Sequence, residues 1–428
     1  MKDILKSIIK ESQEKEIYDI KPRLIKIPVN LPLIVSLIGA RRSGKTYLLY
    51  SVIKQLVENG IPRENIIYLN FEDERLNLQT SDLDLILQSY YELYPEIKLA
   101  DCYFLFDEIQ NIEGWEKFVR RIFDTQTKKI FITGSNSKLL STEIATSLRG
   151  RTITYTVFPL SLTEYLQFRN IEIDLHHPHK KAKLINHTAQ FINNGGFPEV
   201  VNFENDIRLK VLQGYFNTMI YRDIIERYKV SDAIMLKIFI KKVFAGIGKP
   251  LSINKIYNDL RSMNYKVSNN YLYDFEEYCN TIFLGISVPK FHFSEIKQAK
   301  SDKKDYCIDT GLLSAIEFST SENNGKLLEN MVFLEFIKTG YDVFYYKEKY
   351  ECDFIIKKEN RLLPVQVSWF LENDKTRERE IRGLAEACNK VNSNEGEIIT
   401  FDQKERFVHQ GIKIKVIPVY QYFLENSL

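Results

Sequence analysis

Eight consecutive residues carry the pattern that holds nucleotide phosphates in proteins. Residues 39–46 read GARRSGKT and fit G-x-x-x-x-G-K-[ST] at each required position. Glycines let the backbone fold into a nest of N–H groups around phosphate oxygens, and the helix that follows directs its positive dipole end at the same anion. Lys45 can reach the β- and γ-phosphates, and the hydroxyl of Thr46 can bind Mg²⁺. We therefore predict ATP and Mg²⁺ as ligands. The predicted nucleotide-binding residues are Gly39, Ala40, Arg41, Arg42, Ser43, Gly44, Lys45 and Thr46.

Two adjacent carboxylates end a later apolar stretch. Residues 102–108 read CYFLFDE, and a buried strand that ends in an acid delivers a carboxylate to the sheet edge where ligands of α/β folds bind. Asp107 is the expected second Mg²⁺ ligand, beside Thr46. Glu108 can orient and polarise the attacking water. Alone, such a pair is better explained as a strand end with two solvated acids, but after a complete phosphate loop it predicts hydrolysis.

A polar strand end and two arginines complete the predicted catalytic set. Residues 129–136 read KIFITGSN. In the additional-strand class of P-loop ATPases, the strand that lies between the phosphate-loop strand and the Asp-Glu strand ends in a polar sensor of the γ-phosphate, here Ser135 or Asn136; the alternative is a simple turn. Arg149 and Arg151 follow, and a guanidinium can stabilise charge on the transferred phosphoryl, in its own subunit or in a neighbour; the alternative is a solvated basic turn. The predicted catalytic residues are Lys45, Glu108, Asn136, Arg149 and Arg151.

Several of these stretches resemble one family. GARRSGKT, LFDEIQNIEGWE, FITGSNS and LRGRTITYTVFPLSLTEYL are similar to segments of the bacterial and archaeal AAA-type ATPases that carry a C-terminal domain of unknown function. The later segments GGFPEVV (195–201), YRDI (221–224) and YCIDTGLL (306–313) are similar as well. The resemblance covers nearly the whole chain after residue 30. It implies an ATPase in the first part of the chain and no particular chemistry in the second.

Apolar stretches that alternate with amphipathic ones must position these residues. From residue 31 the alternation is typical of a parallel sheet covered on both sides. We predict an α/β fold: a P-loop NTPase parallel sheet with helices on both faces (additional-strand class), then a helical and winged-helix region, and then a small nuclease-like α/β domain. The predicted divisions are an N-terminal helical arm (1–30), the P-loop domain (31–165), a helical linker region (166–230), a winged-helix-like domain (231–320) and the nuclease-like domain (321–428).

The last segment is predicted as helix, two strands, helix and two strands, and its first part has the layout of the PD-(D/E)xK nuclease superfamily. Glu329 falls in a predicted helix, Asp353 in a predicted strand, and Gln366 and Ser368 in the next predicted strand. In that superfamily the carboxylates hold a metal and a lysine readies the water. Here Gln366 replaces the usual acid, and Ser368 stands where the lysine is needed. We therefore expect a degenerate site without nuclease activity, unless Lys375 folds back to supply the cation; the alternative is no relation to that fold.

The predicted winged helix has an ambiguous charge pattern. A DNA-reading winged helix would place its third helix, here residues 269–279, in the major groove, but this segment carries three carboxylates, which would repel phosphates. Basic residues lie beside it and could grip a nucleic-acid backbone; the alternative is a structural winged helix with a solvated lysine loop. These basic residues are Arg261, Lys266, Lys297, Lys300, Lys303 and Lys304.

Composition excludes several classes of protein. Of 428 residues, 44% are hydrophobic and 27% are charged, so wholesale disorder is excluded. The 59 Lys and Arg nearly balance the 57 Asp and Glu, which excludes a histone-like protein but not a local basic patch. The longest nearly apolar stretch, residues 31–40, is shorter than the roughly 20 residues of a membrane helix. The N-terminus is too charged for a secretory signal, and the five dispersed cysteines form no C-x-x-C pair.

The sequence thus predicts a cytoplasmic ATPase without membrane contact. We expect hydrolysis to change the relation between the P-loop domain and the C-terminal half, in a nucleotide-driven switch or motor. Three roles for that motion stay open: association with nucleic acid, regulation through protein partners bound by the C-terminal half, and ATP control of a DNA nuclease. An oligomer is compatible with each role.

Overall fold

The computed structural model describes residues 1–16, 20–136, 148, 150–316 and 324–425. It divides the chain into two compact units, Met1–Val157 and Phe158–Leu428. Across the described ranges, no helix combines the length and the apolar character needed to cross a membrane.

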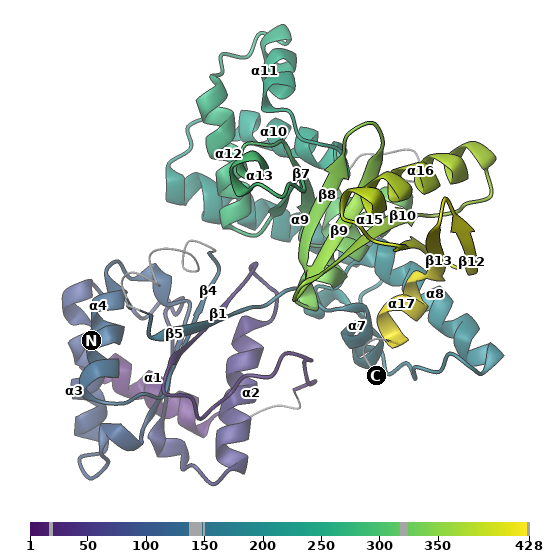
Figure 1. The fold of residues 1–428 in the computed structure, drawn as a ribbon. Helices are drawn as coiled ribbons and strands as arrows, with labels where there is room; N and C mark the ends of the chain where they lie inside the picture. The colour runs from purple at the N-terminus through teal and green to yellow at the C-terminus, as the bar shows by residue number, and fades with distance from the viewer. Residues whose placement is uncertain (17–19, 137–147, 149, 317–323, 426–428) are drawn as a thin grey trace. The chain divides into compact units, whose positions relative to one another are not determined.

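The first unit is built on a parallel sheet with the strand order β2-β3-β4-β1-β5. Strand β4 lies between the phosphate-loop strand β1 and the Asp-Glu strand β3, which is the order predicted from the sequence. Helix α2 covers one face of the sheet, and α3 and α4 cover the other (Figure 1). The strands are β1 (Ile34–Ile38), β2 (Ile66–Asn70), β3 (Tyr103–Asp107), β4 (Ile130–Gly134) and β5 (Thr152–Thr156). The helices are α1 (Lys2–Glu14), α2 (Lys45–Glu58), α3 (Asp84–Leu93) and α4 (Trp115–Thr125).

Burial on both faces explains why these strands read as continuous apolar runs. All residues of β1, β3 and β4 are buried. The register pairs Asn70 with Asp107 and Ile38 with Gly134, so the carboxyl ends of four strands meet at one edge. The N-terminal segment, predicted as a helical arm, forms α1, which buries Leu5, Ile8 and Ile9 and packs on α3 and β2.

The second unit begins with helices and a two-stranded hairpin. The three helices predicted between residues 233 and 279 are present, and the second and third begin at Ser252 and Ser268, whose hydroxyls accept backbone N–H groups at 3.3 Å as predicted N-caps. An antiparallel hairpin of β6 and β7 follows; the winged-helix assignment itself stays a prediction. The helices are α7 (Leu162–Phe168), α8 (Pro178–Asn194), α9 (Asn205–Thr218), a π-helical segment (Met219–Glu226), α10 (Ala233–Ala245), α11 (Ile253–Ser262), α12 (Asn269–Thr281), α13 (Glu295–Ala299) and α14 (Thr310–Ile316), and the strands are β6 (Gly285–Pro289) and β7 (Lys303–Cys307).

The unit ends in a six-stranded mixed sheet with the order β12-β13-β11-β10-β9-β8. The sequence predicts two strands on each side of a helix, whereas the structure has three on each side. Helix α16 packs on β9, β10 and β11 (Figure 1). The elements are α15 (Asn324–Lys338), β8 (Asp342–Lys347), β9 (Glu351–Lys358), β10 (Arg361–Ser368), α16 (Asp374–Lys390), β11 (Glu395–Thr400), β12 (Glu405–His409), β13 (Ile412–Pro418) and α17 (Val419–Glu425).

Two of the stretches that carry the family resemblance pack against each other inside this unit. The carboxylate of Asp309, in YCIDTGLL, accepts the N–H of Gly196, in GGFPEVV, at 2.6 Å. A Cβ on Gly311 would lie 2.0 Å from the carbonyl oxygen of Asn194. Glycine and aspartate at these positions therefore serve the close packing of the two stretches.

Candidate functional site

The loop after β1 has the backbone that a phosphate nest needs. Gly44 takes φ +101° directly before α2 begins at Lys45. Gly39 takes φ +154°, and a Cβ there would lie 2.1 Å from the carbonyl oxygen of Val157. Any other residue would be strained at both positions. The Oγ of Ser43 is buried and, within the described part of the chain, has no hydrogen-bond partner, so the loop keeps a polar atom available for a ligand.

Lys45 and Glu108 form a buried ion pair beside this loop. The Lys45 Nζ lies 3.2 Å from the Glu108 Oε1 and donates to the carbonyl oxygens of Gly39 and Ala40 at 3.2 Å. Burial acts to raise the pKa of the Glu108 carboxyl, but the Lys45 ammonium, the Gln110 amide and the Arg41 charge together outweigh it, so the pKa lies below its usual value. Glu108 also takes φ +52°, a left-handed conformation that costs energy for a non-glycine residue and that proteins often keep at functional sites.

Asp107 lies at the centre of a second network at the same sheet edge. Its Oδ2 accepts the Thr46 hydroxyl at 2.8 Å and the Tyr68 hydroxyl at 3.0 Å. Its Oδ1 accepts the Thr133 hydroxyl at 2.5 Å, and Thr133 in turn accepts the backbone N–H of Glu108 at 2.8 Å. Burial and the neighbouring Glu108 raise the pKa of Asp107. The structure thus joins Thr46 and Asp107, the two oxygen donors predicted to hold Mg²⁺, and this donor set fits that hard cation.

The predicted sensor residues lie close to these networks. Ser135 is buried directly after β4, and its Oγ accepts the side-chain amide of Gln110 at 3.4 Å. The same amide donates to the Glu108 Oε2 at 2.5 Å. Asn136 follows Ser135 at this edge of the sheet, which is where a sensor of the γ-phosphate has to lie, and its sensor role stays a prediction.

The structure does not bring Arg151 to the phosphate loop. Arg151 directly precedes β5, and its carbonyl oxygen accepts the N–H of Ile34 at the start of β1. It therefore lies at the amino edge of the parallel sheet, opposite the loop, and its Nε lies 3.1 Å from the Asp124 Oδ1. This placement does not support a role for Arg151 at the nucleotide of its own chain. Arg149 lies outside the described residues.

Three residues of the site were missed by the sequence analysis. Thr133 lies two residues before the predicted sensor Ser135, and the polar end of β4 was the available signal. Gln110 follows the Asp-Glu pair and could have been suspected from its position. Tyr68 reaches Asp107 from the neighbouring strand β2, so only the strand order identifies it.

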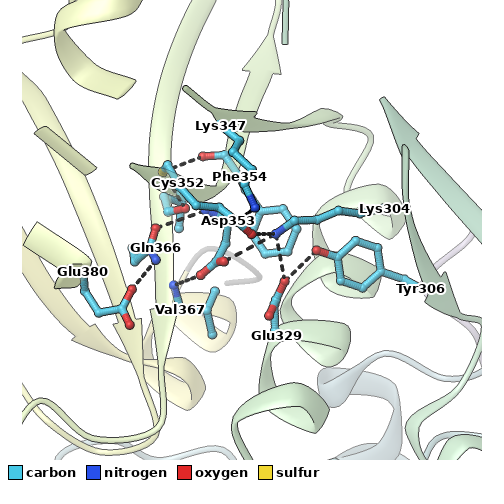
Figure 2. A network of polar contacts seen from close by, with 12 residues as sticks. Lys304, Tyr306, Glu329, Lys347, Cys352, Asp353, Phe354, Gln366, Val367 and Glu380 are labelled. Carbon is cyan, nitrogen blue, oxygen red and sulfur yellow. Dashed lines mark hydrogen bonds and ion pairs between the residues drawn. The ribbon is translucent and has the colours of Figure 1, made fainter. Parts of the chain in front are cut away.

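A second polar cluster lies in the C-terminal unit (Figure 2). It brings together Glu329 of α15 and Asp353 of β9, as the sequence predicts, and adds Glu351 at the start of β9. The cation between them is Lys304 of β7, whose Nζ lies 2.8 Å from Glu351, 3.6 Å from Glu329 and 3.7 Å from Asp353.

Lys304 corrects two expectations. The sequence analysis grouped it with lysines that either grip a nucleic-acid backbone or form a solvated loop, but it is fully buried, whereas Lys297, Lys300 and Lys303 are exposed. Lys375 was the candidate for a missing cation, but it is exposed on the first turn of α16. The sequence analysis missed Lys304 because β7 and α15 are separate segments that only tertiary packing joins.

Gln366 and Ser368 are neutral side chains that form hydrogen bonds around the cluster and add no charge to it. The Gln366 Oε1 accepts the backbone N–H of Asp353 at 3.0 Å, and its amide donates to Glu380. The Val367 N–H donates to the Asp353 Oδ2 at 2.9 Å (Figure 2). The Ser368 hydroxyl donates to the carbonyl oxygen of Phe370 at 3.0 Å. The degenerate nuclease site therefore stays a prediction in which Gln366 positions Asp353.

Comparisons with known proteins match three segments of the chain to family models. Residues 32–166 match the model of a family described as an AAA domain, and residues 185–323 and 324–422 match two different domains of unknown function. An uncharacterized protein of Methanocaldococcus jannaschii, MJ1544, is 36% identical over 428 residues, which cover 94% of this chain and 92% of that protein. An uncharacterized protein of Haemophilus influenzae is 33% identical over 333 residues, 77% of this chain and 81% of that protein.

Solved structures show only distant likeness. The Aeropyrum pernix ORC1 protein in complex with DNA is 11% identical, with a TM-score of 0.31 over 74% of this chain and 90% of that one. CDC6P from Pyrobaculum aerophilum is 12% identical, with a TM-score of 0.26 over 71% and 90%. These TM-scores indicate distant structural similarity and nothing about function. The sequence relatives and the AAA-domain match are sufficient: the chain belongs to the family of AAA-type P-loop ATPases that carry C-terminal domains of unknown function.

Proposed function

We propose that this protein hydrolyses ATP with Mg²⁺ and works as a nucleotide-driven switch or motor in the cytoplasm. The observation that carries the proposal is the meeting of two networks at one sheet edge, Lys45 with Glu108 and Thr46 with Asp107. One network supplies a cation for phosphate and a carboxylate for water, and the other supplies oxygen donors for a metal.

Each side chain has a distinct part in hydrolysis. Lys45 leaves Glu108 and pairs with the β- and γ-phosphates, which the loop N–H groups also bind. Glu108 is then free to accept a hydrogen bond from the attacking water and to orient it. Thr46 and Asp107 would hold Mg²⁺, which neutralises charge on the phosphates. Thr133 keeps both acidic residues in place through one hydroxyl group, which donates to the Asp107 carboxylate and accepts the backbone N–H of Glu108.

Phosphate release from ATP tests the enzymatic part of the proposal. The purified wild-type chain should hydrolyse ATP in the presence of Mg²⁺. Lys45→Ala should lose both nucleotide binding and turnover, because it removes the cation that faces the phosphates. Lys117→Ala, on the exposed side of α4, is the control and should behave as wild type. Turnover by Lys45→Ala at the wild-type rate would refute the assignment of this site.

One observation favours association with nucleic acid over a protein-partner switch. Lys297, Lys300 and Lys303 are exposed on the segment that joins β6 to β7 and at the start of β7, where they can contact a phosphate backbone without base readout. DNA affinity should then fall steeply with salt, with a log–log slope of about −0.9 for each phosphate contacted.

Charge reversal separates the two roles. The double variant Lys297→Glu and Lys300→Glu should flatten the salt slope, whereas the control Lys357→Glu and Lys358→Glu, on the exposed end of β9, should leave it unchanged. Fluorescence anisotropy with labelled duplex, with and without ATP, measures both. Absence of binding at low salt in both conditions would favour regulation through protein partners.

A further inference from the structure

Lys304 reaches the carboxylate cluster from another part of the chain. It belongs to the β6–β7 hairpin, whereas Glu329 lies on α15 and Glu351 and Asp353 lie on β9. Its ammonium points toward the carboxylates of Glu329 and Asp353 (Figure 2). The distances of 2.8, 3.6 and 3.7 Å place one buried positive charge among three oxygen donors from two elements.

The surrounding contacts hold the strand of this lysine in place. Two residues further along β7, Tyr306 is fully buried and donates to the Glu329 Oε1 at 2.7 Å. The backbone of Cys307, which follows, exchanges two hydrogen bonds with the Asn330 side chain, at 2.8 and 2.9 Å. These contacts hold β7, the strand that carries Lys304, against α15, the helix that carries Glu329.

The charges explain why an ammonium is retained here. Lys304 is fully buried, and its Nζ lies 2.8–3.7 Å from an oxygen of each of the three acidic side chains. An isolated buried charge is costly, so an ammonium is retained inside a protein where negative charges surround it. Among the described residues, Lys304 is a buried cation that contacts all three acids.

Carboxylates that converge on a central cation are the ligand chemistry of hard divalent metals. As the described side chains stand, however, no group of three or more His, Cys, Asp or Glu is arranged to hold a metal. We propose that Lys304 is a built-in counter-ion that fills a latent divalent-cation site formed by Glu329, Glu351 and Asp353, and that it thereby keeps the C-terminal domain closed to metal. Removal of the ammonium converts the cluster into a site for Mg²⁺ or Mn²⁺.

Mn²⁺ titration of the full chain without nucleotide tests this proposal. Free Mn²⁺ is followed by its EPR signal in an Asp107→Asn background, which removes the carboxylate of the predicted ATPase metal site. The background should bind no Mn²⁺ at the cluster. Addition of Lys304→Met should create one site, with an apparent affinity at least about tenfold above any residual binding, or about 1.4 kcal/mol. The matched control Lys303→Met, on the exposed face of the same strand, should bind as the background does.

Two results would overturn the proposal. The first is Mn²⁺ binding by the background that Asp353→Asn abolishes, because the cluster would then accept a metal beside the ammonium. The second is a folded Lys304→Met variant that binds no more Mn²⁺ than Lys303→Met, because Lys304 would then be a structural ion pair only.

A second variant decides the matter if Lys304→Met does not fold. Lys304→Met combined with Glu351→Gln removes one of the uncompensated charges and leaves Glu329 and Asp353 as ligands. This double variant should bind Mn²⁺ and melt at a higher temperature in its presence, since a ligand that binds only the folded state stabilises it. A folded double variant whose melting temperature and EPR signal do not respond to Mn²⁺ would refute the latent site. The closed site also predicts no Mg²⁺-dependent DNA cleavage above that of Asp353→Ala.

Discussion

Replacement of Glu108 by glutamine should separate ATP binding from ATP hydrolysis. The substitution keeps the size and hydrogen-bonding shape of the side chain and removes its charge. In the structure that charge serves two partners, the Lys45 ammonium at 3.2 Å and the Gln110 amide at 2.5 Å. The Lys45 contact has to break when phosphate takes its place, so Glu108 competes with ATP for Lys45 before it acts on water.

The two effects have opposite signs. A hydrogen bond to a charged group contributes about 1.5–3 kcal/mol, and a neutral one about half of that. Glu108→Gln should therefore release up to about 1.4 kcal/mol of competition at Lys45 and tighten ATP binding by up to about tenfold. Loss of the carboxylate that orients and polarises water should lower kcat by about 10²–10⁴.

Isothermal titration with ATP measures the affinity, and phosphate release at saturating ATP measures kcat. Glu113→Gln, an exposed glutamate in the segment between β3 and α4, controls for loss of one negative charge nearby and should match wild type in both. If Glu108→Gln hydrolysed ATP at the wild-type rate, a residue other than Glu108 would have to position the attacking water. ATP binding weaker than wild type would refute the competition between Glu108 and phosphate for Lys45.

Three further predictions concern residues that affect the stability of the fold. Thr133→Val removes hydrogen bonds to Asp107 and from the Glu108 N–H, so the free energy of unfolding, measured by urea denaturation, should fall by about 2 kcal/mol; an unchanged value would contradict the network. Gly311→Ala should destabilise the chain by about 1–3 kcal/mol, because the added Cβ meets a backbone carbonyl at 2.0 Å, whereas Gly214→Ala in open space on α9 should not destabilise it. Burial and a neighbouring aspartate raise the pKa of Glu276 from 4.5 to about 7, so between these values the folded chain binds more protons than the unfolded one and stability falls as pH rises. Glu276→Gln should therefore raise the melting temperature above pH 7 and lose this advantage below pH 4.5, and exposed Asp274→Asn on the same helix should not; a pH-independent effect would contradict the pKa shift.

The sequence by itself determined the features whose residues are contiguous. The phosphate loop could be predicted because Gly39, Gly44 and Lys45 act through the local backbone of one strand, one turn and one helix. Asp107 and Glu108 followed from the rule that parallel strands end at one edge. The helix starts at Ser252 and Ser268 also depend on neighbours within three residues, so local pattern was sufficient for them.

Tertiary structure decided the contacts between residues that are far apart in the chain. Thr133 and Tyr68 reach Asp107 because β4 and β2 flank β3, and Arg151 lies away from the loop because its strand begins at the opposite sheet edge. Lys304 is the clearest case: by sequence it is one of several lysines in a charged stretch, and only the packing of β7 against α15 and β9 removes it from water and surrounds it with carboxylates. Burial sets the sign and strength of a charge interaction, and burial is a property of the folded chain that local pattern does not encode.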